Sequence, residues 1–121
     1  FLLRRMDMST IQICKDFSDA PGGRYEKEGE HSGEEFREKV LYPQIKDLVD
    51  HKDHNDKVTI NFDGCYGFGT SFLEEAFGGL VRKYHIIGLM KYIEIESKED
   101  ETIPRLVEKY ILEAERRLGH A

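Results

Sequence analysis

A glycine-rich connection between an alternating strand and an amphipathic helix constrains the fold of this chain more than any other feature. Apolar residues at Val58, Ile60 and Phe62 alternate with polar ones, and this period of two predicts a strand with one apolar face. Apolar residues then recur at helical spacing from Phe72 to Tyr84, which predicts a helix packed on a core. A strand followed by such a helix is the repeating unit of α/β domains.

The connection itself is the first candidate for a functional site. Gly64, Gly67 and Gly69 predict a loop whose backbone turns sharply or is closely approached. The loop leads to Ser71 and Glu74, which match a capping box that starts the helix. A helix start carries unpaired N–H groups and a partial positive charge, and ligands of α/β domains usually sit at the carboxyl ends of strands.

The remaining apolar patterns predict further strands and a last helix. We expect strands over Ser9–Cys14 and Lys91–Ser97, and a short strand over Arg24–Lys27 that pairs back. Thr102 is expected to cap the last helix, with Pro104 in its first turn. Strands separated by helices favour parallel pairing through right-handed crossovers.

Two helices are expected to be irregular. Ser32 caps a first helix, which Pro43 is expected to kink near Tyr42 or to split in two. Gly78 and Gly79 lie inside the next helix, where each costs roughly 1 kcal/mol relative to alanine. We expect close packing of that helix backbone on the sheet to offset this cost.

The length of 121 residues suffices for one domain with a single core. We expect this domain to cover residues 8–118. Residues 1–7 are expected to be a mobile extension, either a cloning remnant or upstream translation, and residues 119–121 a tail. The net charge of −6 without a basic stripe argues against nucleic-acid binding, and no apolar run is long enough to span a membrane. Cys14 and Cys65 show no CxxC spacing, so we expect a cytoplasmic protein with reduced thiols.

Three motifs resemble a known family when they are read together and in order. They are Pro21–Tyr25 (PGGRY), Ser32–Arg37 (SGEEFR) and Tyr66–Arg82 (YGFGTSFLEEAFGGLVR). They are similar to the bacterial STAS-like domain of unknown function, over about residues 8 to 118. The resemblance implies an α/β fold with a mixed central sheet of about four strands and three helices packed mainly on one face.

The resemblance also implies a partner. STAS domains include anti-sigma factor antagonists, which bind an ATPase-type kinase and are switched by phosphorylation of a serine at a helix start. Their Asp-Ser-Ser-Gly-Leu pattern falls on residues 69–73 and places Ser71 on the phosphorylatable position. This chain departs from that pattern at Gly69 and at Phe72.

The local charges argue against a phosphate on Ser71. A phosphate adds a charge of about −1.5 to −2, which Asp63, Glu74 and Glu75 would repel. No lysine or arginine nearby in the sequence offsets that repulsion. Two interpretations of Ser71, a helix cap and a phosphorylation site, stay open, because a cap can also be modified.

Arg24, Arg82 and Cys65 each allow two interpretations. Arg24 follows two glycines, and its guanidinium could bind an anion or a carboxylate of a partner. The alternative is an ion pair with a neighbouring Asp or Glu, which the acidic composition favours. Arg82 pairs with a carboxylate on the helix surface or projects towards a partner. Cys65 would be a nucleophile if His31 or His85 came close enough in space to lower its pKa. Otherwise it is a buried apolar thiol.

No motif matches a known cofactor site. His51 and His54, two residues apart in a polar turn, do not have the spacing of a zinc site. The glycine loop lacks the lysine and the spacing of a nucleotide-binding loop. We therefore expect no metal and no cofactor.

These observations favour a non-enzymatic regulatory module that binds a protein through Asp63–Thr70 and the exposed edge of the Ser71–Tyr84 helix. The resemblance implies a histidine-kinase-like ATPase or anti-sigma-type kinase as the partner, with Ser71 or Thr70 as the phosphate acceptor.

Two other hypotheses compete with this one. The first is a small-molecule or anion-sensing, or weakly catalytic, α/β domain that uses the Gly64–Ser71 loop, Cys65 and Arg24. The second is a small homodimer with a structural role.

Overall fold

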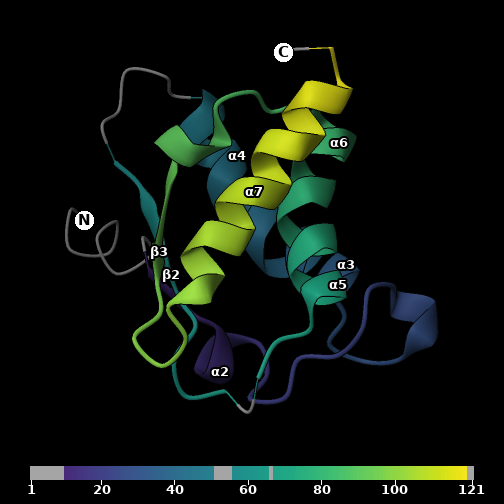
Figure 1. Cartoon of the computed structure of the whole chain (residues 1–121), viewed down its shortest axis with the longest axis vertical. Coiled ribbons are helices and arrows are strands. Elements are labelled where there is room, and N and C mark those ends of the chain that lie inside the picture. Colours follow the sequence, from purple (N-terminus) through teal and green to yellow (C-terminus); the bar gives the residue numbers. More distant parts are fainter. Residues whose placement is uncertain (1–9, 51–55, 66, 120–121) are drawn as a thin grey trace.

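The computed structural model describes most of the chain, namely residues 10–50, 56–65 and 67–119. The predicted extension over residues 1–7, the turn with His51 and His54, and the last two residues of the predicted tail lie outside the described residues. Figure 1 shows the described part as a small sheet with helices on one side. None of the helices in this part is long and apolar enough to cross a membrane.

The sheet is smaller than the resemblance implies. In spatial order its strands are β1 (Thr10–Gln12), β2 (Val58–Asn61) and β3 (Ile93–Glu96). β2 pairs in parallel with both neighbours, and this register places Ile11, Ile60 and Ile95 in one row. Among the described residues the sheet is therefore three-stranded and parallel, rather than mixed with about four strands.

The alternation in the strands separates two faces of the sheet. The face towards the helices is apolar and largely buried, as in Ile11, Val58, Ile60 and Ile93. The opposite face carries exposed polar residues, namely Thr10, Gln12, Glu94 and Glu96. One apolar face is enough to hold the helices, and the predicted strand patterns at β2 and β3 are confirmed.

The predicted strand over Arg24–Lys27 is wrong, because this segment turns into η1, a 3-10 helix over Glu26–Glu28. The N–H groups of Arg24 and Tyr25 both donate to Glu28 Oε1, over 3.1 and 3.0 Å. The carboxylate thus takes the donors that a strand would offer to its neighbour.

The first long helix consists of α3 (Gly33–Phe36), the π turn η2 (Arg37–Leu41) and α4 (Tyr42–Asp50). The Ser32 hydroxyl accepts from the N–H of Glu35 over 3.0 Å, which confirms the predicted cap. The helix does not split at Pro43. The irregularity expected near Tyr42 is the π turn, in which the Tyr42 N–H reaches the carbonyl of Arg37.

The second long helix follows the same plan, with α5 (Thr70–Leu73), the π turn η3 (Glu74–Gly78) and α6 (Gly79–Tyr84). Its predicted apolar stripe is buried, including Phe72, Leu73, Ala76, Phe77, Leu80 and Val81. The two π turns pack against each other. Because π turns occur often at functional sites, the contact between η2 and η3 is a candidate site.

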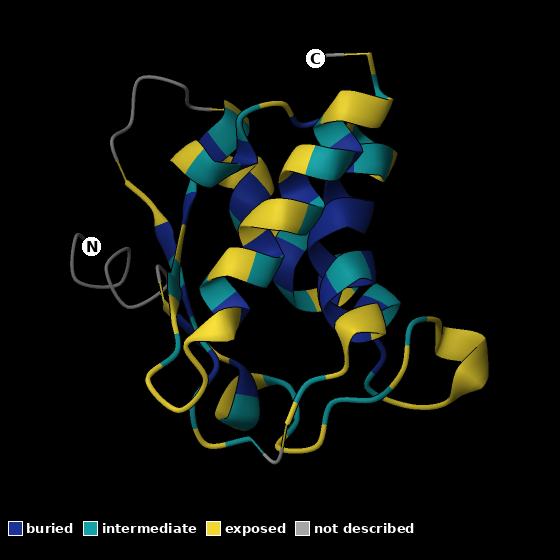
Figure 2. Ribbon diagram, in the orientation of Figure 1, coloured by how far each residue is buried: buried dark blue, intermediate teal, exposed yellow. Residues whose placement is uncertain are grey.

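The last helix, α7 (Thr102–Arg117), packs against η3 and α6 and closes the core (Figure 2). Thr102 is its first residue and not its cap, since the N–H and hydroxyl of Thr102 donate to the carboxylate of Asp100. Two short helices complete the fold, namely α2 (Ile13–Asp16) directly after β1 and the 3-10 helix η4 (Leu89–Lys91) before β3.

Candidate functional site

The loop between β2 and α5 is fixed on its inner side and open on its outer side. The Phe68 ring packs against Phe62 and Phe72, with ring centroids 4.9 and 5.8 Å apart. Gly67 and Gly69, on either side of Phe68, are exposed. The core therefore holds the loop through one aromatic side chain and leaves the flanking backbone at the surface.

Asp63 binds backbone groups and is not an unpaired charge beside the helix start. Its carboxylate accepts from the N–H groups of Lys98 and Glu99, over 2.9 Å each. In return, the N–H of Gly64 donates to Glu99 Oε1 over 2.9 Å. These contacts connect the start of the loop to the turn between β3 and α7.

Thr70 and Ser71 begin the helix with exposed side chains. Gly69 is the capping residue, and within the described residues no side chain caps this helix start. The predicted capping box of Ser71 and Glu74 is therefore wrong. Ser71 lies one position inside the helix, and the Glu74 carboxylate is held by arginines.

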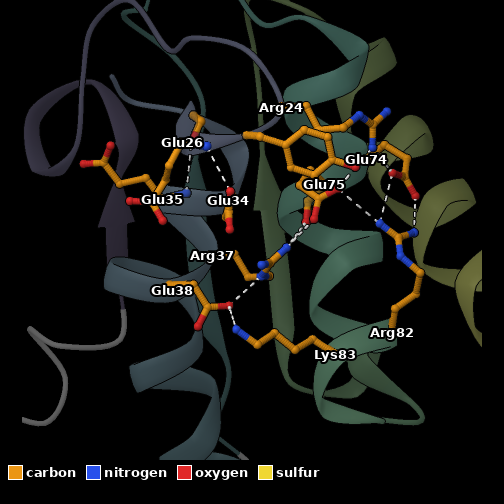
Figure 3. A network of polar contacts seen from close by, with 12 residues as sticks. Arg24, Glu26, Glu34, Glu35, Arg37, Glu38, Glu74, Glu75, Arg82 and Lys83 are labelled. Carbon is orange, nitrogen blue, oxygen red and sulfur yellow. Dashed lines mark hydrogen bonds and ion pairs between the residues drawn. The ribbon is translucent and has the colours of Figure 1, made fainter. Parts of the chain in front are cut away.

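Glu74 and Glu75 form the centre of an ion-pair cluster between the two long helices (Figure 3). Arg24 Nη1 lies 2.5 Å from Glu74 Oε1 and 3.2 Å from Glu75 Oε1. Arg82 Nη1 lies 2.5 Å from Glu74 Oε2, and its Nη2 lies 3.4 Å from Glu75 Oε1. The predicted pairing of Arg24 and Arg82 with carboxylates is confirmed, and Arg24 attaches the loop before α3 to the second helix.

The inner part of the cluster is buried. Arg37 Nη1 lies 2.5 Å from Glu75 Oε2, and the two side chains are only 6% and 9% exposed. Arg37 Nε donates to Glu38 over 2.7 Å, and Lys83 Nζ lies 3.2 Å from the same carboxylate. We call these residues the arginine–glutamate cluster: Arg24, Arg37, Glu38, Glu74, Glu75, Arg82 and Lys83.

Gly78 and Gly79 make room for this cluster, and not for the sheet as expected from the sequence. A Cβ on Gly78 would lie 2.6 Å from Glu74 Oε2. A Cβ on Gly79 would lie 2.5 Å from Arg37 Nη1 and 2.9 Å from Glu75 Oε2. The cluster therefore explains why two poor helix formers stand side by side within this helix.

The cluster lowers the pKa of two of its carboxylates, those of Glu74 and Glu38. Burial acts to raise the pKa of Glu74, but hydrogen bonds from Arg82 and Arg24 outweigh it and lower the pKa. Burial likewise acts to raise the pKa of Glu38, and hydrogen bonds from Tyr84, Arg37 and Lys83 bring it below its usual value. The hydrogen bond to Glu74 in turn raises the pKa of Arg24.

Arg37 is the functional candidate that sequence reasoning missed. It lies between Phe36 and Leu41 on the buried side of its helix, where a charged residue requires a partner. That partner, Glu75, is 38 positions away. The sequence therefore shows that Arg37 needs a partner, but not which residue the partner is. An arginine within an apolar stripe was the available signal.

The other candidate residues are not brought together at one point. A shallow depression lined by Tyr25, Glu26, Lys27 and Glu34 lies on the neighbouring loop, and it does not enclose Arg24 with Ser71. Cys65 lies at the β2 end of the loop, where its thiol donates to the Ser18 carbonyl over 3.6 Å. His31 packs edge-on against Phe17.

Comparison with known proteins addresses the family of the chain. A family model described as a STAS-like domain of unknown function matches residues 32–100. The chain belongs to this family. In this STAS-like domain the match runs from the cap of α3 to the turn after β3, so it includes the start of α5 and most of the cluster but not Arg24 or α7. No curated protein and no solved structure matches the chain.

Proposed function

We propose that this STAS-like domain is a regulatory module that binds a partner protein through the loop after β2 and the start of α5. The observation that carries the proposal is the exposure of Thr70 and Ser71, whose hydroxyls take no part in capping their helix. Side chains that the helix does not need for its start are available to a partner. The surface includes the exposed backbone of Gly67 and Gly69.

The proposal extends to phosphorylation of Ser71 or Thr70 by a histidine-kinase-like ATPase or anti-sigma-type kinase, a step that rests on the resemblance to STAS domains. The charges of the described residues support it. Glu74 and Glu75 are matched by arginines, and Asp63 is bound by backbone N–H groups. With four basic and three acidic side chains, the arginine–glutamate cluster has a net charge of +1.

Glu74 and Glu75, the two carboxylates closest to Ser71 in its helix, are paired with arginines, while Asp63 keeps its negative charge. The helix start contributes a further partial positive charge. The repulsion inferred from the sequence considered the carboxylates without partners, and the pairing of Glu74 and Glu75 with arginines supports the proposal against that objection.

The competing hypothesis of anion sensing has less support. The Arg24 guanidinium already contacts two carboxylates, Glu74 and Glu75. A free anion would have to displace them, and the adjacent depression contains two more glutamates, Glu26 and Glu34. Arg24 is better explained as a residue that positions the loop before α3.

The test uses the kinase-like ATPase domain encoded nearest to this chain in its genome. The full chain is incubated with that domain and ATP and then measured by intact mass, in parallel with Ser71→Ala, Thr70→Ala and the double variant. We expect one added phosphate on the unmodified chain and none on the double variant, with the single variants naming the acceptor. A chain that neither gains phosphate nor binds the ATPase domain in a pull-down would overturn the proposal.

A further inference from the structure

Two thiols that the proposed function does not use lie together beside the candidate loop. Cys14 lies in α2, directly after β1, and Cys65 lies in the loop directly after β2. β1 and β2 pair in parallel with Gln12 beside Asn61, so the segments that follow them leave the sheet at the same edge. Both cysteines are free and partly buried.

The backbone places Cys14 Sγ directly against the residue that precedes Cys65. A Cβ placed on Gly64 would lie 2.8 Å from Cys14 Sγ, so the chain just before Cys65 passes directly over that sulfur. Gly64 has a φ of +92°, a conformation that favours glycine. The Cys65 thiol donates to the carbonyl of Ser18 over 3.6 Å, on the same side of the sheet edge as α2.

Cys65 is an unreactive thiol when it acts alone. Burial, followed by the neighbouring Cys14 thiol, raises the pKa of Cys65 to about 12. At neutral pH the group is therefore protonated, which removes the basis for Cys65 as a catalytic nucleophile. It can still take part in the second step of a disulfide-forming reaction, because there its proton leaves with the departing hydroxide and the electrophilic sulfur belongs to the neighbouring segment.

We propose that Cys14 and Cys65 are a dithiol site for a peroxide, whose oxidation closes a disulfide between α2 and the loop that leads to α5. The sulfur of Cys14 attacks one oxygen of hydrogen peroxide and the O–O bond breaks. Cys14 becomes a sulfenic acid, and the departing hydroxide takes the thiol proton to form water.

In the second step the sulfur of Cys65 attacks the sulfur of Cys14. The S–S bond forms, the S–O bond breaks, and the hydroxide leaves with the proton of Cys65 as a second water. Two electrons pass from the two thiols to one peroxide. The product fixes the β2 end of the loop to α2, a few residues before Thr70 and Ser71, so oxidation alters the motion of the proposed docking surface without changing its chemistry.

The test treats the full chain with hydrogen peroxide, blocks the remaining thiols with N-ethylmaleimide, and measures intact mass without reductant. We expect a monomer that lacks two hydrogen atoms, takes up no N-ethylmaleimide and yields a linked Cys14–Cys65 peptide. Dithiothreitol should restore two reactive thiols. Cys14→Ser and Cys65→Ser, each with one thiol, should form no such monomer.

A second readout reports on the loop. Amide hydrogen exchange over residues 67–71 should slow in the oxidised chain and recover after reduction. Peroxide-treated chain that still takes up two N-ethylmaleimide groups, gains oxygen on cysteine, or forms only disulfide-linked dimers would overturn the proposal. The result for the unsubstituted chain decides the question even where a serine variant folds poorly.

Discussion

At the scale of single residues, the surroundings of two serine hydroxyls distinguish a helix cap from an exposed helix position. Ser32 and Ser71 both stand near a helix start and both are followed by a glutamate three positions later. Ser32 is buried and accepts a hydrogen bond from Glu35, whereas Ser71 is exposed within the helix. The same short motif therefore caps a helix at Ser32 and does not cap one at Ser71.

Alanine substitution should separate these two serines. Ser32→Ala should lower the free energy of unfolding by about 1 kcal/mol, because a cap is lost. Ser71→Ala should change it by less than about 0.5 kcal/mol, because an exposed helix position tolerates alanine. Urea unfolding followed by circular dichroism measures both, and equal losses would contradict the assigned cap positions.

The buried ion pair makes a second prediction at this scale. Arg37→Met leaves Glu75 without its buried partner and should lower the free energy of unfolding by about 3 kcal/mol. Lys39→Met is the matched control, since Lys39 lies in the same π turn with its side chain 65% exposed, and it should cost less than about 0.5 kcal/mol. Similar effects of the two substitutions in urea unfolding would argue against a structural role of the pair.

At the scale of elements, the two long helices are joined by charge at the position where each widens into a π turn. Arg37 begins η2, and Glu74 and Glu75 begin η3. Gly78 and Gly79 leave the volume that these side chains occupy. The packing of the two helices therefore depends on three features together, namely the irregular turns, the glycines and the ion pairs.

A methyl group at Gly79 should disturb the packing of the two helices around the ion pairs. Gly79→Ala gains up to about 1 kcal/mol of helix propensity, yet its Cβ would lie 2.5 Å from Arg37 Nη1, and we expect a net loss of about 1–3 kcal/mol. Gly69→Ser is the control, because it adds a side chain at the open cap of α5 and should be neutral or slightly stabilising. Both are measured by thermal unfolding, and a stabilised Gly79→Ala protein would show that the cluster does not fill this space.

At the scale of the whole molecule, acid should weaken the connection between the helices. The pKa of Glu74 is lower in the folded chain than the usual value of about 4.5. Its contribution to stability is therefore complete above that value and is lost as the pH falls below it towards the folded pKa.

Urea midpoints measured from pH 7 down to pH 3 should fall most steeply below about pH 4.5. Glu74→Gln should flatten this fall, whereas Glu108→Gln, on the exposed side of α7, should leave it unchanged. An equal slope for all three proteins would show that Glu74 is not a source of the acid sensitivity.

The sequence predicted the parts of the fold that follow from local periodicity. The strands around Ile60 and Ile93 and the buried stripe from Phe72 to Val81 were predicted correctly, because burial of one face leaves a repeat in the sequence. The segment at Arg24 was predicted wrongly, because carboxylates several positions away take its N–H groups. Local propensity does not show such competition.

The sequence predicted the exposed helix start but not which residues form the ion pairs beside it. The exposed start of α5 follows from the glycine loop, yet the pairing of Glu74 with Arg24 spans 50 positions and that of Glu75 with Arg37 spans 38. Only the folded chain brings these charges together. The repulsion inferred for Ser71 counted the acidic residues and not the distant arginines that pair with Glu74 and Glu75.

The loop after β2 and the start of α5 form the surface that we propose a partner protein binds. The most direct measurement is amide hydrogen exchange of the full chain with and without the kinase-like ATPase domain encoded nearest to it. We expect protection concentrated over residues 63–75, with little change on the exposed face of α7 around Leu112. Protection confined to α7 or to the polar face of the sheet would contradict it.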